Sequence, residues 1–413
     1  MKARDIELGP WPVGINNVAP ERSTVFSRRR ENEPALIEAM NVDLDNKGWV
    51  SRRDGYSSVM SLVSPEGLYS VDNSLLVQDD GVLYSVELST LNVEPVLETG
   101  HQPLSITEAI GQYWFINDQV RGRVVNNSVV FWGLNIPDSP TLTANTESGS
   151  LPAGTYMVTV TVEADGVESG APVASKITLG ETGSVIVSLD SVDANAEEVT
   201  IYCSDLNGKD LFWYSTEELG SLEWTITTTP SSIDPLDGFN EYPPPYGNIV
   251  RHYKGRMLVV DGSVLYWSEP LAYHRFKIQT SAQMFPRNIT FLEPQTDGFY
   301  VADTETVWWV QGDDPESWAL REVYKGKVFQ QTPVRVPANA FDGLNYSGEA
   351  LVWACDSGFV TGSPGGQIGF LDKENIALDT YESASLAFRN KGSVQQILLA
   401  LNNQTDTNPR KIR

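Results

Sequence analysis

One phrase recurs along the chain and constrains the fold more than any other feature. Each copy is a short apolar segment, a turn of Asp, Asn, Gly, Ser or Thr, and a second segment rich in Val and aromatic residues. Such turn residues tolerate positive φ, and β-branched and aromatic side chains favour strands, so each copy predicts a β-hairpin. The copies are LLVQDDGVLYSV near residue 80, RVVNNSVVFWG near 127, MLVVDGSVLYWS near 261, FYVADTETVWWV near 303 and LVWACDSGFVTG near 356.

The interval between the copies predicts how the hairpins assemble. The copies near 261 and 303 are about 40 residues apart, and the copy near 356 follows at a longer interval. Periods of about 40–50 residues with several strands each are typical of β-propeller blades, which bury their faces by stacking on neighbouring blades. We therefore predict an all-β fold with a β-propeller-like body, and a β-sandwich or an irregular β-sheet protein is the alternative.

The spacing breaks between residues 137 and 230. This stretch contains LPAGTYMVTVTVEADGVESGAP, in which alternation of apolar and polar residues predicts a strand with one buried face. Its length and strand spacing favour a β-sandwich, and the quoted phrase is similar to fibronectin type III-like modules. We predict an immunoglobulin- or fibronectin III-like sandwich inserted into the propeller.

The division of the chain follows from these two patterns. Residues 1–60 are expected to form an N-terminal arm and first strands, and residues 61–136 the first propeller blades. After the insert of 137–230, residues 231–388 are expected to supply the remaining blades, and 389–413 a C-terminal arm that ends in NNQTDTNPRKIR.

Charge is distributed unevenly between the insert and the rest. The chain has 54 acidic and 29 basic residues, a net charge of −25. Residues 137–230 hold 15 acidic residues, two Lys and no Arg, a net of −13, which leaves −12 for the remainder. Proteins that grip nucleic acid neutralise phosphates with Lys and Arg, so this balance argues against a DNA-gripping protein.

Cysteine usage and hydropathy indicate where such a protein is made. Cys203 and Cys355 lie far apart without a CxxC spacing, which favours neither a disulfide framework nor a thiolate metal site. The opening MKARDIELGPW has no apolar run typical of a secretory signal, and no segment approaches the length of a membrane span. We expect assembly in a reducing cytoplasm.

Residue patterns that carry catalysis or bind cofactors are not found. The three histidines, His101, His252 and His274, share no HxH or HExxH spacing, and no P-loop, GxSxG elbow or GxGxxG–helix context is present. Asp43 and Asp45 resemble the start of a calcium loop, but the closing Glu is missing, so a β-turn is favoured. We predict no catalytic residues, no metal site, no cofactor and no enzymatic activity.

Two clusters of arginine are the candidate functional residues. Arg28, Arg29 and Arg30 form one run, and Arg52 and Arg53 form a pair. In an acidic protein that assembles with itself, a basic arm that meets an acidic neighbour is physically reasonable. We predict that these five residues make inter-subunit contacts.

Several phrases, in their order along the chain, resemble a family of phage virion proteins. They are GINNVAPERSTVF, EAMNVDLDNKGWVSRRDGYSSV, GRMLVVDGSVLYWSEPLAYHRF and PQTDGFYVADTETVWWVQGDDPES. The family comprises the tail nozzle or tail-tube proteins of short-tailed bacteriophages, with a packaged-DNA-stabilisation-like role. The resemblance implies a structural protein of the virion tail, assembled in the host bacterial cytoplasm, that forms a ring of six copies below the portal and adaptor and channels or retains genomic DNA.

The same resemblance implies the partners. These are other copies of the chain, adaptor or head–tail connector proteins, tail fibre or tail tip proteins, and genomic DNA that passes through the lumen without sequence-specific contact. Two other functions fit the residues. One is a glycan-binding tail fibre or adhesin with exposed aromatic shelves near Trp308 or Trp267, and the other is a propeller hydrolase that uses a pair of carboxylates on polysaccharide.

Overall fold

The chain is an all-β protein. The computed structural model describes residues 36, 42–44, 49–52, 60–72, 74–125, 128–330, 332–340, 348–371, 378, 383–391 and 394–402. Within these residues the elements are strands and three one-turn 3-10 helices, η1 (Pro315–Ser317), η2 (Ala338–Ala340) and η3 (Pro364–Gly366). None of the described helices is long and apolar enough to cross a membrane.

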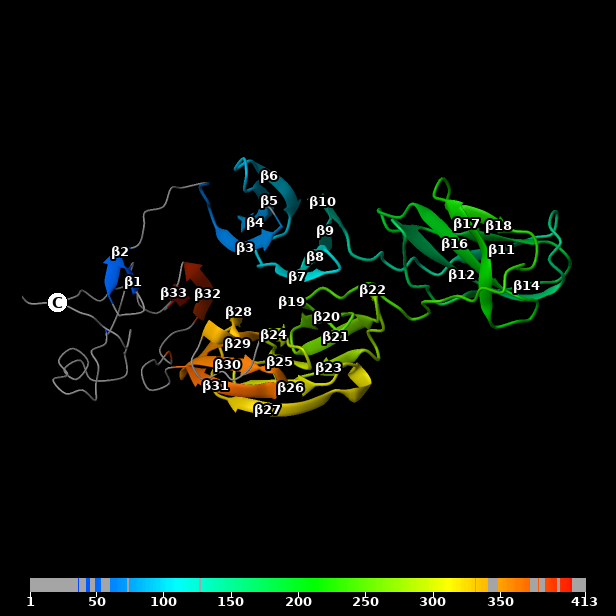
Figure 1. Ribbon diagram of the computed structural model, residues 1–413. Helices are drawn as coiled ribbons and strands as arrows, with labels where there is room; N and C mark the ends of the chain where they lie inside the picture. The colour runs from blue at the N-terminus through cyan, green and yellow to red at the C-terminus, as the bar shows by residue number, and fades with distance from the viewer. Residues whose placement is uncertain are drawn as a thin grey trace, which may run out of the picture. The chain divides into compact units, whose positions relative to one another are not determined.

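Five antiparallel meanders of four consecutive strands make up most of the body (Figure 1). Each is the building unit of a propeller blade, so the fold is propeller-like. The first blade contains β3 (Pro65–Val71), β4 (Ser74–Asp79), β5 (Val82–Glu87) and β6 (Val93–Glu98). The second contains β7 (Ser105–Ala109), β8 (Gln112–Ile116), β9 (Arg121–Val125) and β10 (Ser128–Phe131). The third contains β19 (Ile249–Tyr253), β20 (Arg256–Asp261), β21 (Val264–Glu269) and β22 (Ala272–Phe276), with β23 (Ala282–Met284) also paired to β21. The last two blades are β24 (Phe291–Pro294), β25 (Gly298–Ala302), β26 (Thr306–Gln311) and β27 (Ala319–Lys325); and β28 (Val334–Pro337), β29 (Glu349–Cys355), β30 (Gly358–Ser363) and β31 (Gln367–Leu371).

The recurring sequence phrase corresponds to one hairpin of each blade. The copies near 80, 261, 303 and 356 are the second and third strands of their blades. The copy near 127 is a hairpin of a different kind, because it joins the third and fourth strands, β9 and β10. In that blade the equivalent hairpin is β8–β9, whose longer turn hides the repeat.

A polar residue stands where the second strand of every blade ends. The five residues are Asp79, Asn117, Asp261, Asp303 and Asp356. Four of them bind the chain that leads into their own blade, as the contacts below show. Asp261 differs, because its position is exposed.

Asn117 fastens the connection from the first blade to the second. Its Nδ2 donates to the carbonyl oxygens of Thr99 (2.8 Å) and Gln102 (2.9 Å), and its Oδ1 accepts from the backbone N–H groups of Gln119 (2.9 Å) and Val120 (2.8 Å). Because Asn117 is 1% exposed, these bonds satisfy an amide that has no access to water. The side chain therefore defines both its own turn and the position of the preceding connection.

Carboxylates take the same role in other blades. Asp79 accepts from the backbone N–H groups of Val63 (3.0 Å) and Ser64 (2.7 Å), just before β3. Asp303, which is fully buried, accepts from the backbone of its own turn and lies 3.5 Å from the guanidinium of Arg287, before β24.

Asp356 binds the connection that leads out of β27. It accepts from the Tyr324 hydroxyl (2.6 Å) and from the backbone N–H of Lys327 (3.4 Å). Burial opposes ionisation of Asp356, but these hydrogen bonds and those from Ser357 hold its pKa below the usual range. The carboxylate is thus kept charged for its structural role.

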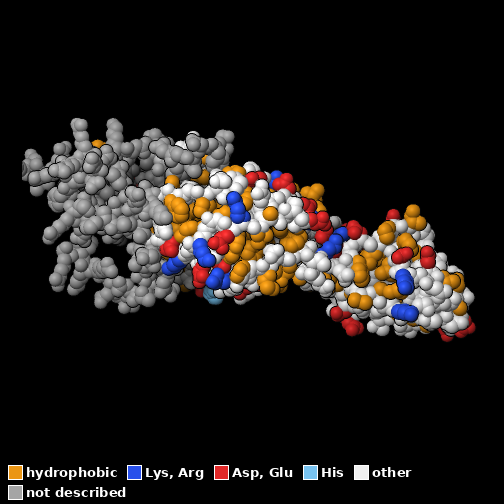
Figure 2. All heavy atoms as spheres, turned by 90° about the horizontal axis from the view of Figure 1, so that it is seen from below, with side chains coloured by type: hydrophobic (Ala, Val, Ile, Leu, Met, Phe, Trp, Pro, Cys, Tyr) orange, Lys and Arg blue, Asp and Glu red, His pale blue; other side chains and the backbone are white. Residues whose placement is uncertain are grey.

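The insert is a two-layered β-sandwich. One sheet has the order β11 (Thr141–Asn145), β15 (Ser184–Ser188), β18 (Glu223–Ile226). The other sheet joins β13 (Val167–Glu168), β12 (Gly154–Ala164), β16 (Glu198–Ser204) and β17 (Leu211–Glu218), with β14 (Ser175–Leu179) also paired to β12. Between the sheets lies a core that includes Tyr156, Val158, Val160, Val162, Val185, Val187, Val199, Ile201 and Ile226. Figure 2 shows acidic side chains at several places on the surface of this sandwich, at the right of the view.

The sandwich interrupts the chain between two blades that still pack on one another. Trp114 of β8 and Trp132, just after β10, meet edge to face with ring centroids 5.2 Å apart, and Tyr273 of β22 lies 5.6 Å from Trp114. The Trp132 indole N–H donates to the carbonyl oxygen of Tyr273 (2.8 Å). The body therefore does not need the insert to bring these two blades together.

The described residues divide into two compact units. One extends from Leu62 to Pro286 and holds the first three blades and the sandwich; the other combines Met1–Ser61 with Arg287–Arg413. The second unit contains two blades and two hairpins, β1 (Val42–Leu44) with β2 (Val50–Arg52), and β32 (Ser383–Lys391) with β33 (Val394–Asn402).

The C-terminal segment differs from the expected arm of 389–413. The boundary at 389 falls inside β32, and the β32–β33 hairpin packs Leu386, Leu399 and Leu401 against Phe329 and Ala354. The mildly basic character of residues 389–413 favoured an arm, whereas the structure uses Arg389 in an ion pair with Asp43 of β1 (2.7 Å). A strand pair therefore stands where much of the arm was expected.

The polar turn residues give a direct stability prediction. Asn117→Ala leaves the carbonyl oxygens of Thr99 and Gln102 and two turn N–H groups without their partner, so we expect it to lower the free energy of unfolding by about 2–3 kcal/mol. Asp261→Ala, at the equivalent but exposed position, is the control, with an expected change within about 0.5 kcal/mol. Equal losses for both variants in urea unfolding would contradict this role for the turn residue.

Candidate functional site

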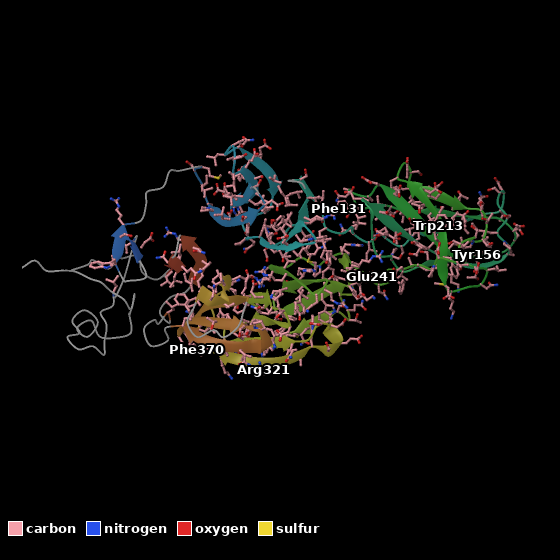
Figure 3. The ribbon with its side chains drawn as sticks, viewed as in Figure 1. Phe131, Tyr156, Trp213, Glu241, Arg321 and Phe370 are labelled. Atoms are coloured by element: carbon pink, nitrogen blue, oxygen red, sulfur yellow. The ribbon has the colours of Figure 1, made fainter. Side chains whose placement is uncertain are left out.

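The strongest concentration of interacting charges lies where the sandwich meets the third blade. Arg275 of β22 extends toward the sandwich, and its guanidinium contacts Glu168 (3.3 Å), Asp237 (3.3 Å) and Glu241 (3.5 Å). The Arg275 side chain is 17% exposed and the Glu241 side chain 7%. Figure 3 shows Glu241 between the sandwich and the third blade. We call these four residues, with Lys277 and Glu269, the junction network.

Lys277 extends the network along the same strand direction. Its Nζ lies 3.5 Å from Glu241 and 3.4 Å from Glu269. Burial raises the pKa of Glu241, although Arg275 and Lys277 act in the opposite direction. The pKa of Lys277 is raised, because its two carboxylate partners outweigh the effect of burial. Arg275 and Lys277 thus pair with four carboxylates, and Glu241 is the least exposed of the four.

Glu168 connects the network to the outer face of the larger sandwich sheet. While its Oε2 faces Arg275, its Oε1 accepts from the hydroxyls of Thr161 (2.7 Å) and Tyr202 (2.9 Å). Burial, followed by the neighbouring Glu168, raises the pKa of Tyr202, so this phenol remains a hydrogen-bond donor. Arg275 is therefore coupled through one carboxylate to strands β12 and β16.

Backbone contacts fix the same junction. A side chain at Gly170 would collide with the carbonyl oxygen of Glu241, so glycine is required where the two segments touch. On the other side, Arg121 of β9 donates to the carbonyl oxygen of Pro244, and its guanidinium lies 4.7 Å from the Tyr246 ring centroid. The chain that leaves the sandwich is thus held by both neighbouring blades.

The segment that leads into the sandwich is also tied down. Asn135 donates through its backbone N–H (3.0 Å) and its Nδ2 (2.8 Å) to Asp193 of the sandwich, and its Oδ1 accepts from Arg121 (3.0 Å). Burial opposes ionisation of Asp193, but hydrogen bonds from Asn195 and Asn135 lower its pKa. Both connections of the insert are therefore anchored.

Four glutamates lie side by side across the larger sandwich sheet. The register places Glu163 opposite both Glu168 and Glu198, and Glu198 opposite Glu218. Like charges directly opposite one another destabilise a sheet. Burial first, and then the charges of Glu168 and Glu198, raise the pKa of Glu163. This row concentrates negative charge at one end of the sheet.

The histidines occupy separate places. His101 lies 3.0 Å from Glu66, and His252 lies 3.1 Å from the Tyr273 hydroxyl. His274 stands beside Arg275, its Nε2 is buried without a hydrogen-bond partner, and burial lowers its pKa to about 4. Within the described part of the chain, no group of three or more His, Cys, Asp or Glu side chains is placed to hold a metal ion.

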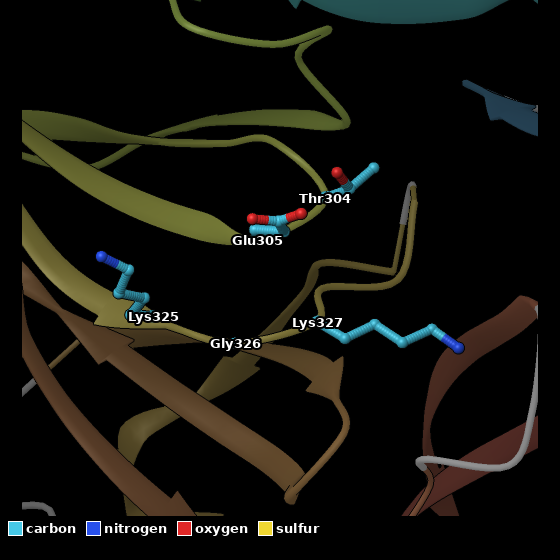
Figure 4. A pocket seen from close by; sticks show the side chains of 5 residues that line it. All are labelled: Thr304, Glu305, Lys325, Gly326 and Lys327. Atoms are coloured by element: carbon cyan, nitrogen blue, oxygen red, sulfur yellow. The ribbon is translucent and has the colours of Figure 1, made fainter.

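A shallow pocket in the fourth blade does not bring reactive groups together. It has a volume of about 520 Å³ and is lined by Thr304, Glu305, Lys325, Gly326 and Lys327. Figure 4 shows the side chains of Lys325 and Lys327 directed to opposite sides. Lys327 lies 4.8 Å from the Phe329 ring centroid. The two cations are therefore not arranged to bind a single anion.

The arginines singled out from the sequence are only partly within the described structure. Arg28, Arg29, Arg30 and Arg53 lie outside the described residues. Arg52 ends β2, is exposed and pairs with Val42. Their expected inter-subunit contacts stay a prediction.

The aromatic pairs are used mainly for packing. Trp309 is fully buried and packs in a tilted arrangement on Tyr300, with ring centroids 4.8 Å apart, while Trp308 is half-buried. Trp267 and Tyr266 are also half-buried, and Tyr266 packs against the core shared by the second and third blades. Neither pair forms the fully exposed aromatic shelf that the glycan-binding alternative anticipates.

The sequence did not single out the junction network. Arg275 and Glu168 are 107 positions apart, so no local spacing connects them. The available signal was the phrase YHRFK in a strongly acidic chain, where Arg275 and Lys277 share one face of an extended segment. Cations spaced by two residues next to an acidic insert indicate a place where the insert is held.

Comparison with protein-family models and with curated proteins finds no match. Among solved structures, the N-terminal domain of Nup159 is similar at 12% identity, covering 82% of this chain and 73% of that one, with a TM-score of 0.32. A streptogramin B lyase (9% identity, 82% and 94% covered, TM-score 0.31) and the WD40 domain of Neurospora crassa Pan2 (8%, 73% and 76%, 0.31) are also similar. Likenesses this remote assign no function to the chain.

Removal of Arg275 tests the junction network. Arg275→Met keeps most of the volume but leaves Glu168 and Glu241 without their shared cation, and we expect a loss of about 2–3 kcal/mol in unfolding free energy after allowance for partial exposure. Lys209→Met, on an exposed sandwich residue, is the control and is expected to change little. If Glu241→Gln combined with Arg275→Met is as unstable as the sum of the single variants, the two residues are not coupled.

The buried His274 gives a pH prediction. Because its pKa in the folded protein is about 4, against about 6.5 when unfolded, the unfolded chain binds a proton first as the pH falls. The wild type should therefore lose up to about 3 kcal/mol relative to His274→Gln between pH 6.5 and pH 4. His101→Gln is the control, since Glu66 raises the pKa of His101 and the wild-type advantage there is lost as the pH rises. A difference between wild type and His274→Gln that does not vary with pH would disprove this effect.

Proposed function

We propose that the chain is a structural subunit of the virion tail of a short-tailed bacteriophage, of the nozzle or tail-tube kind. Six copies form a ring that channels or retains genomic DNA below the portal and adaptor. The observation that supports this most is the acidic sandwich, inserted between two packed blades and held on both connections by polar contacts. Such an insert is a fixed arm on a body, as a subunit of an assembly requires.

The use made of polar side chains supports a structural role. The buried groups Asp79, Asn117 and Asp303 each bind backbone of their own blade. Glu241 and Arg275 are engaged with one another and with their neighbours. These five polar residues thus hold chain segments in place. The assignment to the tail family rests on the order of the phrases that resemble it.

We assign separate roles to the acidic sandwich and to the acidic remainder of the chain. The sandwich, which we infer to be an immunoglobulin- or fibronectin III-like module, carries a net of −13 and would face other tail components, such as connector, tail fibre or tip proteins. The rest of the chain carries −12. Around a lumen that charge would repel DNA within a Debye length of about 8–10 Å, so that DNA passes without adhering.

Native mass spectrometry of the full chain tests the ring. We expect a species of six copies, and Arg52→Glu to reduce its abundance, because Arg52 is exposed on β2 and is one of the predicted inter-subunit contacts. Lys209→Glu, a reversal at an exposed sandwich position, is the matched control and should leave the species intact. A trimer would favour the fibre alternative, and a monomer under all conditions would disprove the ring.

A further inference from the structure

The chain that enters the sandwich and the chain that leaves it pass one another beside His274 of β22. A Cβ added to Gly133, just after β10, would lie 3.3 Å from the His274 carbonyl oxygen and 3.1 Å from Cδ of Pro244. Gly133 belongs to the entering chain, where it takes a φ of 79°, and Pro244 belongs to the returning chain. Both connections of the sandwich therefore run past one histidine of the third blade.

The returning chain is attached to β22 by few backbone bonds. Tyr242 and Phe276 exchange two hydrogen bonds, each 2.8 Å long, in an isolated antiparallel bridge. Residues 243–245 are prolines, which have no N–H to donate, so they cannot donate to extend this ladder toward the blade. A run of prolines is also stiff, and Arg121 holds the carbonyl oxygen of Pro244. The bridge therefore lies between the sandwich and a semi-rigid segment that stays with the blades.

The His274 ring lies in this junction without compensation for a positive charge. Its Nε2 is buried and, among the described residues, has no hydrogen-bond partner. Arg123 of β9 and Arg275 of β22 both disfavour a charge on the ring. The carboxylates of the junction network pair instead with the cations of that network: Glu168, Asp237, Glu241 and Glu269. A protonated ring would therefore add a further cation and a buried N–H without an acceptor.

We propose that protonation of His274 opens the Tyr242–Phe276 bridge and releases the sandwich from the third blade, while both keep their folds. In the closed junction a charged ring is opposed by two guanidinium groups and by burial, and exposure to water relieves both. The sandwich core and the ring contacts of Trp114 with Trp132 and Tyr273 are made by other residues, so they persist when the bridge opens. The junction is an acid-sensitive hinge within one copy of the chain, and it does not depend on the proposed ring.

The direction of the effect follows from the two environments of His274. Its pKa is about 4 in the closed junction and returns toward 6.5 when the ring is exposed. The open form therefore binds a proton first, so closure is favoured most above pH 6.5 and weakens as the pH falls toward 4. Between pH 7.5 and pH 5 the ratio of open to closed molecules should rise about 30-fold.

Other charged groups of the junction respond differently. Burial raises the pKa of Glu241, so the closed junction takes up a proton there and closure is favoured in acid; its pKa is displaced less than that of His274, which determines the sign. Asp193, which holds the entering chain through Asn135, has a lowered pKa, so its contribution is lost only below its ordinary value of 3.8. The returning chain is therefore released before the entering chain.

Hydrogen–deuterium exchange of the full chain measures the hinge. The protection factors of the Tyr242 and Phe276 amides, corrected for the intrinsic effect of pH on exchange, should fall about 30-fold from pH 7.5 to pH 5. Peptides from β12 in the sandwich and from β20 in the third blade should stay protected at both pH values. Parallel loss of protection in β12 and β20 would show global unfolding and overturn the hinge.

Neutral substitutions test the role of the histidine. In His274→Gln, and in His274→Asn with its smaller side chain, protection of the bridge should not vary with pH, because neither side chain takes up a proton. His252→Gln is the matched control, since burial also lowers the pKa of His252 but its ring bonds the Tyr273 hydroxyl; it should show the fall of the wild type. An equal fall in the wild type and in both His274 variants, or no fall in the wild type, would overturn the proposal.

Discussion

A buried polar side chain at the end of the second strand is the contact on which the blades depend. Asn117 satisfies its own turn and also holds the backbone that leads into its blade, with four hydrogen bonds. Asp79 and Asp356 hold the incoming backbone with carboxylate oxygens, and Asp303 binds its own turn and the Arg287 guanidinium. Because a buried polar group without a partner costs more than a formed hydrogen bond contributes, each such residue specifies one path for the chain. Each of these contacts thereby fixes the segment that enters its own blade.

The same logic explains how a large insert is tolerated. The second and third blades are already joined by Trp114, Trp132 and Tyr273, so the chain can leave and return between them without loss of that core. The return path is then fixed by Arg275, Glu168 and Glu241. Buried ion pairs contribute little net stability when compared with apolar packing, but an unpaired member is costly, so such pairs favour one arrangement over others. The junction network therefore acts on the position of the sandwich more than on its folding.

The sequence predicted those elements that are determined by residues close together in the chain. Hairpins were predicted because turn residues and β-branched strands are neighbours in the chain, and four of the five quoted phrases are the equivalent hairpin of a blade. The second blade was misaligned because its turn from Asn117 to Val120 is longer than the others. The part of the β32–β33 hairpin from Arg389 onward was taken for an arm because that segment is mildly basic, and its apolar face is recognised only against Phe329 and Ala354. The junction network joins positions more than 100 residues apart, so only the folded chain brings Arg275 and Glu168 together.

The central claim is that the sandwich is held in one position on its blades. Double electron–electron resonance between spin labels at Lys209→Cys in the sandwich and Asp261→Cys in the third blade measures this directly, since both native cysteines, Cys203 and Cys355, are buried. The account predicts a narrow distance distribution that broadens when Arg275 is replaced by Met. A distribution that is already broad in the otherwise unchanged protein, or one that Arg275→Met leaves narrow, would contradict it.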